Sequence, residues 1–309
     1  MIAKKYYPEG YLSGMAKNRA ALINISTVQD AAEKGEILEA DAFVCDCDHN
    51  LIVNLGCMRG IVPREEGAVG ISEGEVRDIA LISRVGKPIC FTVEEIRTDS
   101  SGVPFAVLSR RRAQEMCRKE YLQKLVPGDI INAKVTHLEN FGAFCDIGCG
   151  ISALLPIDSI SVSRIAHPRD RFLCGANIKA AVRSVDERGR ITLTLKELLG
   201  TWEENAAQFA QGETVGGIIR SVEDYGVFIE LTPNLAGLAE PRSDVKVGQS
   251  AGVYIKSLLP EKLKVKLIIV DAFDRSEPPA PLKYYQTDSH IDRWVYSPPG
   301  ANRVVETVF

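Results

Sequence analysis

The chain has 309 residues, 45% of them hydrophobic, and a formal net charge of −4. This length suggests two or three small domains, and the slightly acidic balance excludes a protein that attracts nucleic acid through a high overall positive charge. The first residues are too polar for a signal peptide and no apolar run reaches membrane-spanning length, so we expect a cytoplasmic protein. Eight scattered cysteines fit a reducing compartment better than a disulfide framework.

The first third of the chain predicts an N-terminal extension followed by a small barrel. Within residues 1–34, Ser26-Thr27-Val28-Gln29 has the pattern of a capping box and predicts a short helix. Residues 35–112 contain strand-like runs at Leu38–Cys47 and Asn50–Gly56. We therefore expect the first barrel between residues 35 and 112.

Two linker helices are expected between the barrels. Residues 113–125 form an amphipathic pattern. Residues 198–210 contain the capping box Thr201-Trp202-Glu203-Glu204. The basic run Arg110-Arg111-Arg112 precedes the first of them. It fits a solvated helix start and a phosphate contact equally well.

Residues 126–197 carry the clearest pattern of the chain. A polar/apolar alternation ends at Val135, and Phe141-Gly142-Ala143-Phe144 follows almost at once, where the glycine allows a bulge that brings two rings to one face. Further strands are predicted at Ala153-Leu154-Leu155 and Ile178–Val185, and Asp186-Glu187-Arg188-Gly189 makes a tight turn into a last strand. Five short strands in so short a segment favour a closed barrel, which hides the sheet edges.

This segment resembles the S1 RNA-binding domain. Five landmarks stand in the family's order and spacing, namely Gly128-Asp129, Phe141-Gly142-Ala143-Phe144, Arg164-Ile165-Ala166-His167-Pro168, Gly175 and the Asp186…Arg190 hairpin. The resemblance implies an all-β fold of three tandem five-stranded OB-fold barrels joined by short linker helices, similar to a short bacterial form of ribosomal protein S1. It also implies binding of single-stranded RNA.

The resemblance implies RNA contacts in the second barrel at Phe141, Phe144, Asp186 and Arg190. The two rings would stack on bases, at ~1–3 kcal/mol each, while Arg190 contacts phosphate or stacks and Asp186 orients it or accepts a hydrogen bond from a base edge. Lys134 is a further candidate for a phosphate contact. With nine Lys/Arg against eight Asp/Glu, this repeat has the least acidic balance of the three and is the expected main RNA site.

Two histidine positions qualify this interpretation. The family often has a histidine where Pro156 stands, so one contact is lost, while His167 matches a separate family element that would flank the groove. The structural alternative is that Phe141 and Phe144 belong to the core and that His167 only caps a turn.

Residues 211–271 repeat the pattern, with Tyr225, Phe228 and Lys264 at the positions of Phe141, Phe144 and Arg190. The long segment that holds residues 160–174 in the second repeat is missing, and Glu240 occupies the histidine position. An acidic side chain opposes phosphate, so we expect a weaker platform here, or a protein contact.

The first repeat has His49 and Ile52 in place of the two aromatic residues, and no arginine matches Arg190. We expect a docking or spacer barrel. The tail, residues 272–309, is rich in Pro, Tyr and Trp and either packs over a barrel or awaits a partner.

Catalysis and metal binding find little support in the sequence. Phosphate loops and nucleophile motifs are missing, and Cys45-Asp46-Cys47-Asp48-His49 lacks the spacing of common zinc pairs. We therefore expect no enzyme, no cofactor and no metal, and neither a membrane nor a small-molecule substrate as partner.

The leading hypothesis is a protein that holds single-stranded mRNA near the small ribosomal subunit. The alternatives are an interaction protein that docks on the ribosome or on an RNA-decay assembly with little RNA affinity of its own, and a regulator that binds one structured RNA.

Overall fold

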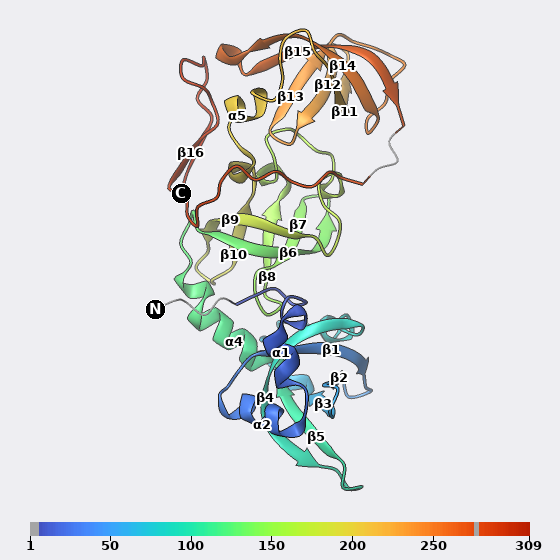
Figure 1. Ribbon diagram of the computed structural model, residues 1–309, viewed down its shortest axis with the longest axis vertical. Helices are drawn as coiled ribbons and strands as arrows, with labels where there is room; N and C mark the ends of the chain where they lie inside the picture. The colour runs from blue at the N-terminus through green and yellow to red at the C-terminus, as the bar shows by residue number, and fades with distance from the viewer. Residues whose placement is uncertain (1–5, 275–277) are drawn as a thin grey trace. The chain divides into compact units, whose positions relative to one another are not determined.

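The computed structural model, which describes residues 6–274 and 278–309, contains three closed five-stranded barrels and a small C-terminal hairpin (Figure 1). The strand orders are β1-β2-β3-β5-β4, β10-β8-β7-β6-β9 and β11-β12-β13-β15-β14. The expected fold class, three tandem OB-fold barrels with few helices, is confirmed.

Strands such as β13 and the first half of β15 alternate buried with less buried residues, as expected of a sheet with one face on a core. The first barrel consists of β1 (Leu38–Cys45), β2 (Leu51–Asn54), β3 (Arg59–Val62), β4 (Lys87–Thr98) and β5 (Pro104–Ser109). The second consists of β6 (Ile130–Glu139), β7 (Gly142–Asp146), β8 (Ser152–Pro156), β9 (Asn177–Val185) and β10 (Ile191–Thr194). The third consists of β11 (Thr214–Glu223), β12 (Gly226–Thr232), β13 (Leu235–Ala239), β14 (Ser250–Leu259) and β15 (Lys264–Phe273). The tail adds the hairpin of β16 (Arg293–Val295) and β17 (Glu306–Val308).

The helices are short; η1, α1 and α2 precede β1, and the others lie between strands. The α-helices are α1 (Ala16–Ala21), α2 (Ile25–Glu33), α3 (Ile79–Ile82), α4 (Arg110–Glu120) and α5 (Trp202–Ala206). The 3-10 helices are η1 (Leu12–Gly14), η2 (Arg64–Glu66), η3 (Leu122–Lys124), η4 (Ile157–Ser159), η5 (Pro168–Asp170), η6 (Lys196–Leu199) and η7 (Pro260–Lys262). Among the described residues, no helix combines the length and the apolar character needed to cross a bilayer.

Helix caps explain where the observed helices depart from the predicted ones. The cap of α2 is Asn24, whose side chain accepts a hydrogen bond from Thr27 N, so the predicted cap at Ser26 is wrong by two residues. Helix α4 begins at Arg110 because the Ser109 hydroxyl accepts from Arg112 N. The capping box predicted at Thr201 is confirmed, with Glu204 as its partner.

The basic run at the start of α4 is paired with acids. Arg110 is 4% exposed and lies 2.7 Å from Glu9, while Arg111 and Arg112 pair with Glu66 and Glu94. For Arg110, both a solvated helix start and a phosphate contact are therefore wrong. Its guanidinium is held in a buried ion pair.

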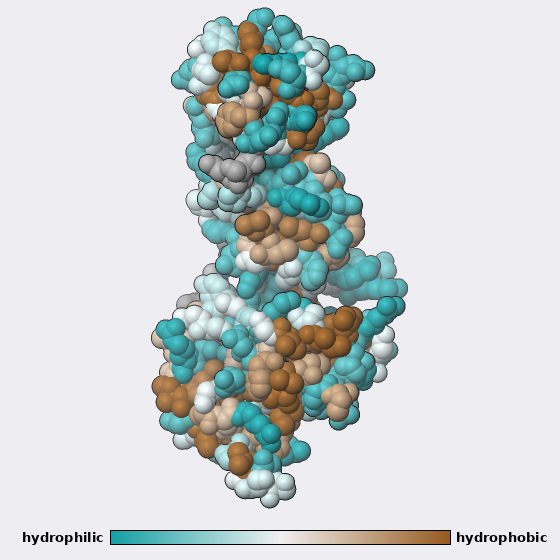
Figure 2. All heavy atoms as spheres, turned by 90° about the vertical axis from the view of Figure 1, so that its right-hand side faces the viewer, coloured by the Kyte–Doolittle hydropathy of each residue, from teal (hydrophilic) through white to brown (hydrophobic). Residues whose placement is uncertain are grey.

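The chain divides into two compact units. The first contains residues up to Leu125 together with 132–134 and 146–152, and the second contains 126–131, 135–145 and 153–309. The core of the first unit surrounds Phe91 and Leu81. Apolar side chains also reach its surface, among them Phe43 and Ile79, and the face drawn in Figure 2 shows brown patches among the teal.

The second unit has one core shared by the second barrel, the linker helix, the third barrel and the tail. This cluster includes Ala181 of β9, Trp202 of α5, Ile229 of β12, and Trp294 and Tyr296 of the tail. The tail aromatic residues therefore pack against the protein.

Candidate nucleic-acid interface

The Phe141–Phe144 pair lies on the outside of the second barrel. Phe141 occupies the turn before β7 and is 56% exposed, while Phe144 is half-buried on β7. The ring planes stand at 87° with centroids 5.9 Å apart, an edge-to-face pair. The interpretation of Phe141 as a core residue is therefore wrong, and its ring is accessible to a ligand.

Local sequence explains this position. Ala143 and Cys145 are buried on either side of Phe144, so alternation along β7 turns its ring outward. A Cβ on Gly142 would lie 2.5 Å from Leu155 O, so only glycine allows β7 to approach β8 this closely.

The third barrel reproduces the arrangement with Tyr225 and Phe228. Tyr225 is 67% exposed in the turn before β12, and the two rings stand at 85° with centroids 6.0 Å apart. A Cβ on Gly226 would lie 2.6 Å from Ala239 O, the same close approach as in the second barrel. The two aromatic pairs are thus repeats in geometry as well as in sequence.

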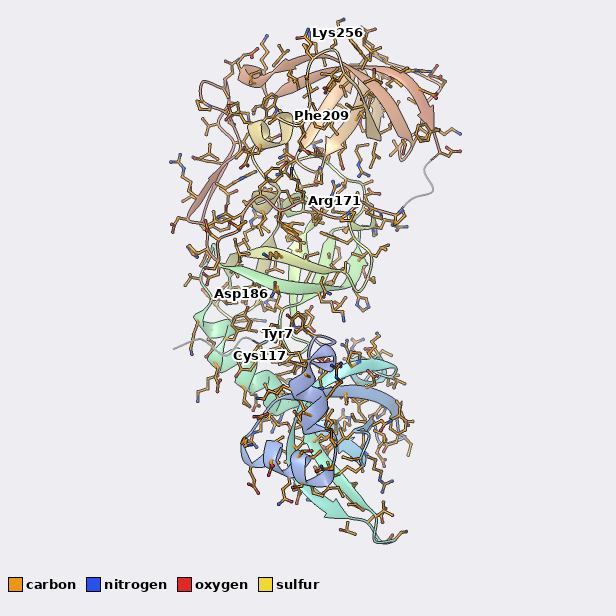
Figure 3. The ribbon with its side chains drawn as sticks, viewed as in Figure 1. Tyr7, Cys117, Arg171, Asp186, Phe209 and Lys256 are labelled. Atoms are coloured by element: carbon orange, nitrogen blue, oxygen red, sulfur yellow. The ribbon has the colours of Figure 1, made fainter. Side chains whose placement is uncertain are left out.

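Lysines flank the third pair. Phe228 pairs across the sheet with Leu238, and Leu238 pairs with Lys266. Lys264 lies two residues before Lys266 on the same exposed face of β15, and Lys256 is exposed on the neighbouring β14 (Figure 3). The described ion pairs of this barrel use Arg220 and Arg242 and leave these three lysines out.

Sequence reasoning named Lys264 and missed Lys256 and Lys266. For Lys266 the signal was present, because the alternation Lys264-Val265-Lys266 places both lysines on one face of a strand. Lys256 could be placed next to these two lysines only once the pairing of β14 with β15 was known.

The hairpin of the second barrel orients Arg190 through Asp186. One carboxylate oxygen of Asp186 accepts hydrogen bonds from Arg188 N and Arg190 N, and the other accepts from Arg190 Nε at 2.6 Å. The backbone N–H of Arg190, and then its guanidinium, hold the pKa of Asp186 below its ordinary value. The side chain of Arg190 is 75% exposed, so its remaining N–H groups face solvent.

Lys134 is engaged in a hydrogen bond with the protein backbone. Its ammonium donates a 2.9 Å hydrogen bond to Glu9 O, within the first unit. His167 acts as the cap of η5, since its Nδ1 accepts from Arg169 N at 3.0 Å. This is the structural alternative for His167 that the sequence left open.

The first barrel has an aliphatic row where the others have rings. Ile52 pairs with Ile61, which pairs with Val107. An arginine is nevertheless present nearby, because Arg59 of β3 lies 2.9 Å from Asp99 and its guanidinium lies 5.5 Å from the centre of the Phe105 ring. Sequence reasoning missed this pair, since Arg59 lies on β3 and Asp99 follows the end of β4, forty residues later.

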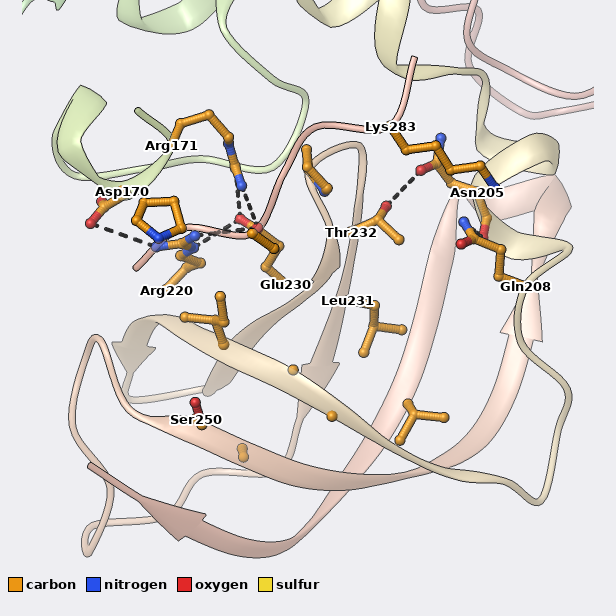
Figure 4. A pocket seen from close by; sticks show the side chains of 18 of the residues that line it. Asp170, Arg171, Asn205, Gln208, Arg220, Glu230, Leu231, Thr232, Ser250 and Lys283 are labelled. Carbon is orange, nitrogen blue, oxygen red and sulfur yellow. Dashed lines mark hydrogen bonds and ion pairs between the residues drawn. The ribbon is translucent and has the colours of Figure 1, made fainter. Parts of the chain in front are cut away.

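A cavity of about 740 Å³ in the second unit is lined by paired charges (Figure 4). Glu230 accepts hydrogen bonds from Arg171 and from Arg220, and Asp170 lies 3.7 Å from Arg220. Burial alone would raise the pKa of Glu230, but the two guanidinium groups outweigh it and hold this pKa below its ordinary value. These four groups neutralise one another, so they act as a structural contact.

Among the described residues, no group of three His, Cys, Asp or Glu side chains could hold a metal ion.

Comparison with known proteins adds to this geometry. Residues 124–196 match the family model of the S1 RNA binding domain. The small ribosomal subunit protein bS1 of Staphylococcus aureus (strain COL) is 29% identical over 261 residues, covering 79% of this chain and 64% of that protein. The bS1 protein of Leuconostoc lactis is 30% identical over 234 residues, covering 70% of this chain and 52% of that protein.

The chain thus spans between about half and two thirds of the length of these relatives. A solved multidomain protein with nucleic acid binding domains from Streptococcus pneumoniae is 13% identical, covering 77% of this chain and 74% of its own, with a TM-score of 0.25. Residues 124–196 are thus similar to the S1 RNA binding domain, and a longer stretch of the chain is similar to bacterial small ribosomal subunit proteins bS1.

Proposed function

We propose that this chain binds single-stranded RNA, as an S1-like cytoplasmic factor that holds mRNA at the small ribosomal subunit for translation. The observation that carries the proposal is the pair of edge-to-face aromatic platforms, Phe141–Phe144 and Tyr225–Phe228, at equivalent positions of two barrels. Exposed rings on an OB-fold strand are the usual seat of unstacked bases.

The mechanism is passive and involves no covalent step. Each base that stacks on a platform contributes about 1–3 kcal/mol, while Arg190 in the second barrel and Lys264 and Lys266 in the third neutralise phosphates. Because both platforms lie in one compact unit, a strand bound to one is held at high effective concentration near the other.

The lysines of β14 and β15 bear on the expectation that the third platform is the weaker one. That expectation rested on Glu240, which is exposed. Exposed cations beside Phe228 favour phosphate binding, so we infer that the third barrel takes part in RNA binding.

The direct test is fluorescence anisotropy with a labelled single-stranded RNA of about fifteen nucleotides, which spans one or two OB folds. The wild type is compared with Phe141→Ala/Phe144→Ala and with Tyr225→Ala/Phe228→Ala, at about 50 and about 200 mM salt. Phe43→Ala serves as the control, because this phenylalanine is 51% exposed but lies on the first barrel. Each platform variant should weaken binding, and the control should not. A folded wild type that binds no RNA at the lower salt concentration overturns the proposal.

A further inference from the structure

The connection between β8 and β9 of the second barrel, residues 157–176, lies against strands of the third barrel. Arg171 donates hydrogen bonds of 2.6 and 2.9 Å to the two carboxylate oxygens of Glu230 on β12. Ser163 N donates to Pro233 O at 3.0 Å. Figure 4 shows Asp170 and Arg171 facing Arg220 and Glu230.

This contact is close to the third aromatic platform. Phe228 and Glu230 lie on the same side of β12, because Ile229 between them is fully buried in the core. Two residues along a strand span about 7 Å. On β11, Ser221 pairs with Phe228 and directly follows Arg220, the neighbour of Asp170. The β8–β9 connection therefore docks two residues along β12 from Phe228, on the side away from Tyr225.

The β8–β9 connection carries exposed arginines. Among its described residues, the third barrel has no exposed arginine of its own on the side of Phe228 that the connection contacts. Arg164 and Arg169 are exposed, and the described ion pairs of the connection involve Asp158, Asp170 and Arg171 instead. The equivalent connection of the third barrel, residues 240–249, is ten residues shorter and contains Glu240 and an Arg242 that is bound to Asp244 at 2.7 Å.

We propose that Arg164 and Arg169 of the second barrel bind phosphates of RNA seated on the Tyr225–Phe228 platform of the third barrel. The RNA site of the third barrel is then composite, and Arg171 and Glu230 are positioning residues that hold the connection beside it. This inference rests on the proposed RNA-binding function, which it deepens by assigning two arginines of one barrel to the platform of the next.

The test asks with which platform the two arginines cooperate. Arg164→Ala/Arg169→Ala is introduced into two full-length backgrounds, Phe141→Ala/Phe144→Ala and Tyr225→Ala/Phe228→Ala, and RNA affinity is measured across a salt series. In the first background only the third platform is intact. There we expect a loss of about tenfold in affinity and a salt slope smaller by about 1.4, as for two phosphate contacts on a single strand.

In the second background the same change should have no more effect than the charge-matched control Arg19→Ala/Arg303→Ala, which removes two exposed arginines elsewhere. Arg164→Lys/Arg169→Lys should restore most of the affinity, because phosphate neutralisation needs the charge. Since Arg164 and Arg169 are exposed, the variants should fold, and circular dichroism verifies this.

A loss confined to the second background would assign the arginines to their own barrel and overturn the inference. An equal loss in both backgrounds, or one no larger than the control, would also overturn it by reducing their effect to general charge. If the wild type itself binds no RNA, the proposed function fails. This result is distinct from the outcomes that overturn only the inference about the two arginines.

Discussion

Arg171 and Glu230 form a bidentate ion pair with hydrogen bonds of 2.6 and 2.9 Å. Their side chains are only 5% and 4% exposed. Arg171 belongs to the second barrel and Glu230 to the third, and Arg220 of the third barrel shares the same carboxylate at 2.8 Å. A buried ion pair of this kind contributes less to stability than to the choice of one arrangement, because both ions lose their hydration.

Glu230→Gln should strongly destabilise the second unit. The substitution leaves two buried guanidinium groups without their shared carboxylate, and removing one partner of such a pair costs about 3–5 kcal/mol. The free energy of unfolding in urea measures the effect. Asp244→Asn is the matched control, since Asp244 is 62% exposed and solvent screens its pair with Arg242, so this change should affect stability little. Equal effects of the two variants would contradict the prediction.

The same carboxylate should make this unit sensitive to acid. The pKa of Glu230 is held below its ordinary 4.5, so its contribution to stability is present above that value and is lost as the pH falls through the lowered pKa. Unfolding midpoints measured from pH 6 downward should fall more steeply for the wild type than for Glu230→Gln. Parallel curves would show that Glu230 is not the group responsible.

His290 should make the docking of the tail depend on pH near neutrality. Its ring lies 2.8 Å from Asp129, and this hydrogen bond raises the pKa of His290 above its ordinary 6.5, against a weaker opposing effect of desolvation. The stabilisation is therefore fully present below pH 6.5 and is lost as the pH rises through the raised value.

Hydrogen exchange reports this change at the neighbouring backbone contacts. Ile130 N donates to Ser289 O and Ile291 N donates to Gly128 O, both at 2.9 Å. Protection factors of these two amides should fall between pH 6 and pH 8.5 in the wild type. In His290→Gln they should start lower and stay constant, and a pH response that survives in this variant would point to another group.

Arg190→Ala should weaken RNA binding with little effect on folding. Its pair with Asp186 is exposed and screened by solvent, so the free energy of unfolding should change little. Loss of one phosphate contact should reduce the salt slope of RNA binding by about 0.7. Arg190→Lys retains the charge and should keep most of that slope. An unchanged slope in Arg190→Ala would remove Arg190 from the interface.

The sequence by itself determined the features that depend on neighbours along the chain. The aromatic pairs follow from a glycine and a two-residue alternation, the Asp186–Arg190 contact joins residues four apart, and the capping box at Thr201 spans three positions. Such short-range patterns predicted three barrels and the rings that each of two barrels presents.

Only the tertiary structure decided which charged groups remain available to bind a ligand. Lys134 binds Glu9 O, Arg110 is buried against Glu9, and Arg171 reaches Glu230 across 59 residues of sequence. Each of these partners is brought close by the packing of distant segments, and a local pattern cannot encode that distance. The burial of the tail follows the same principle, because Trp294 and Tyr296 join a core cluster formed by residues of the second barrel, α5 and the third barrel that lie far from them in the sequence.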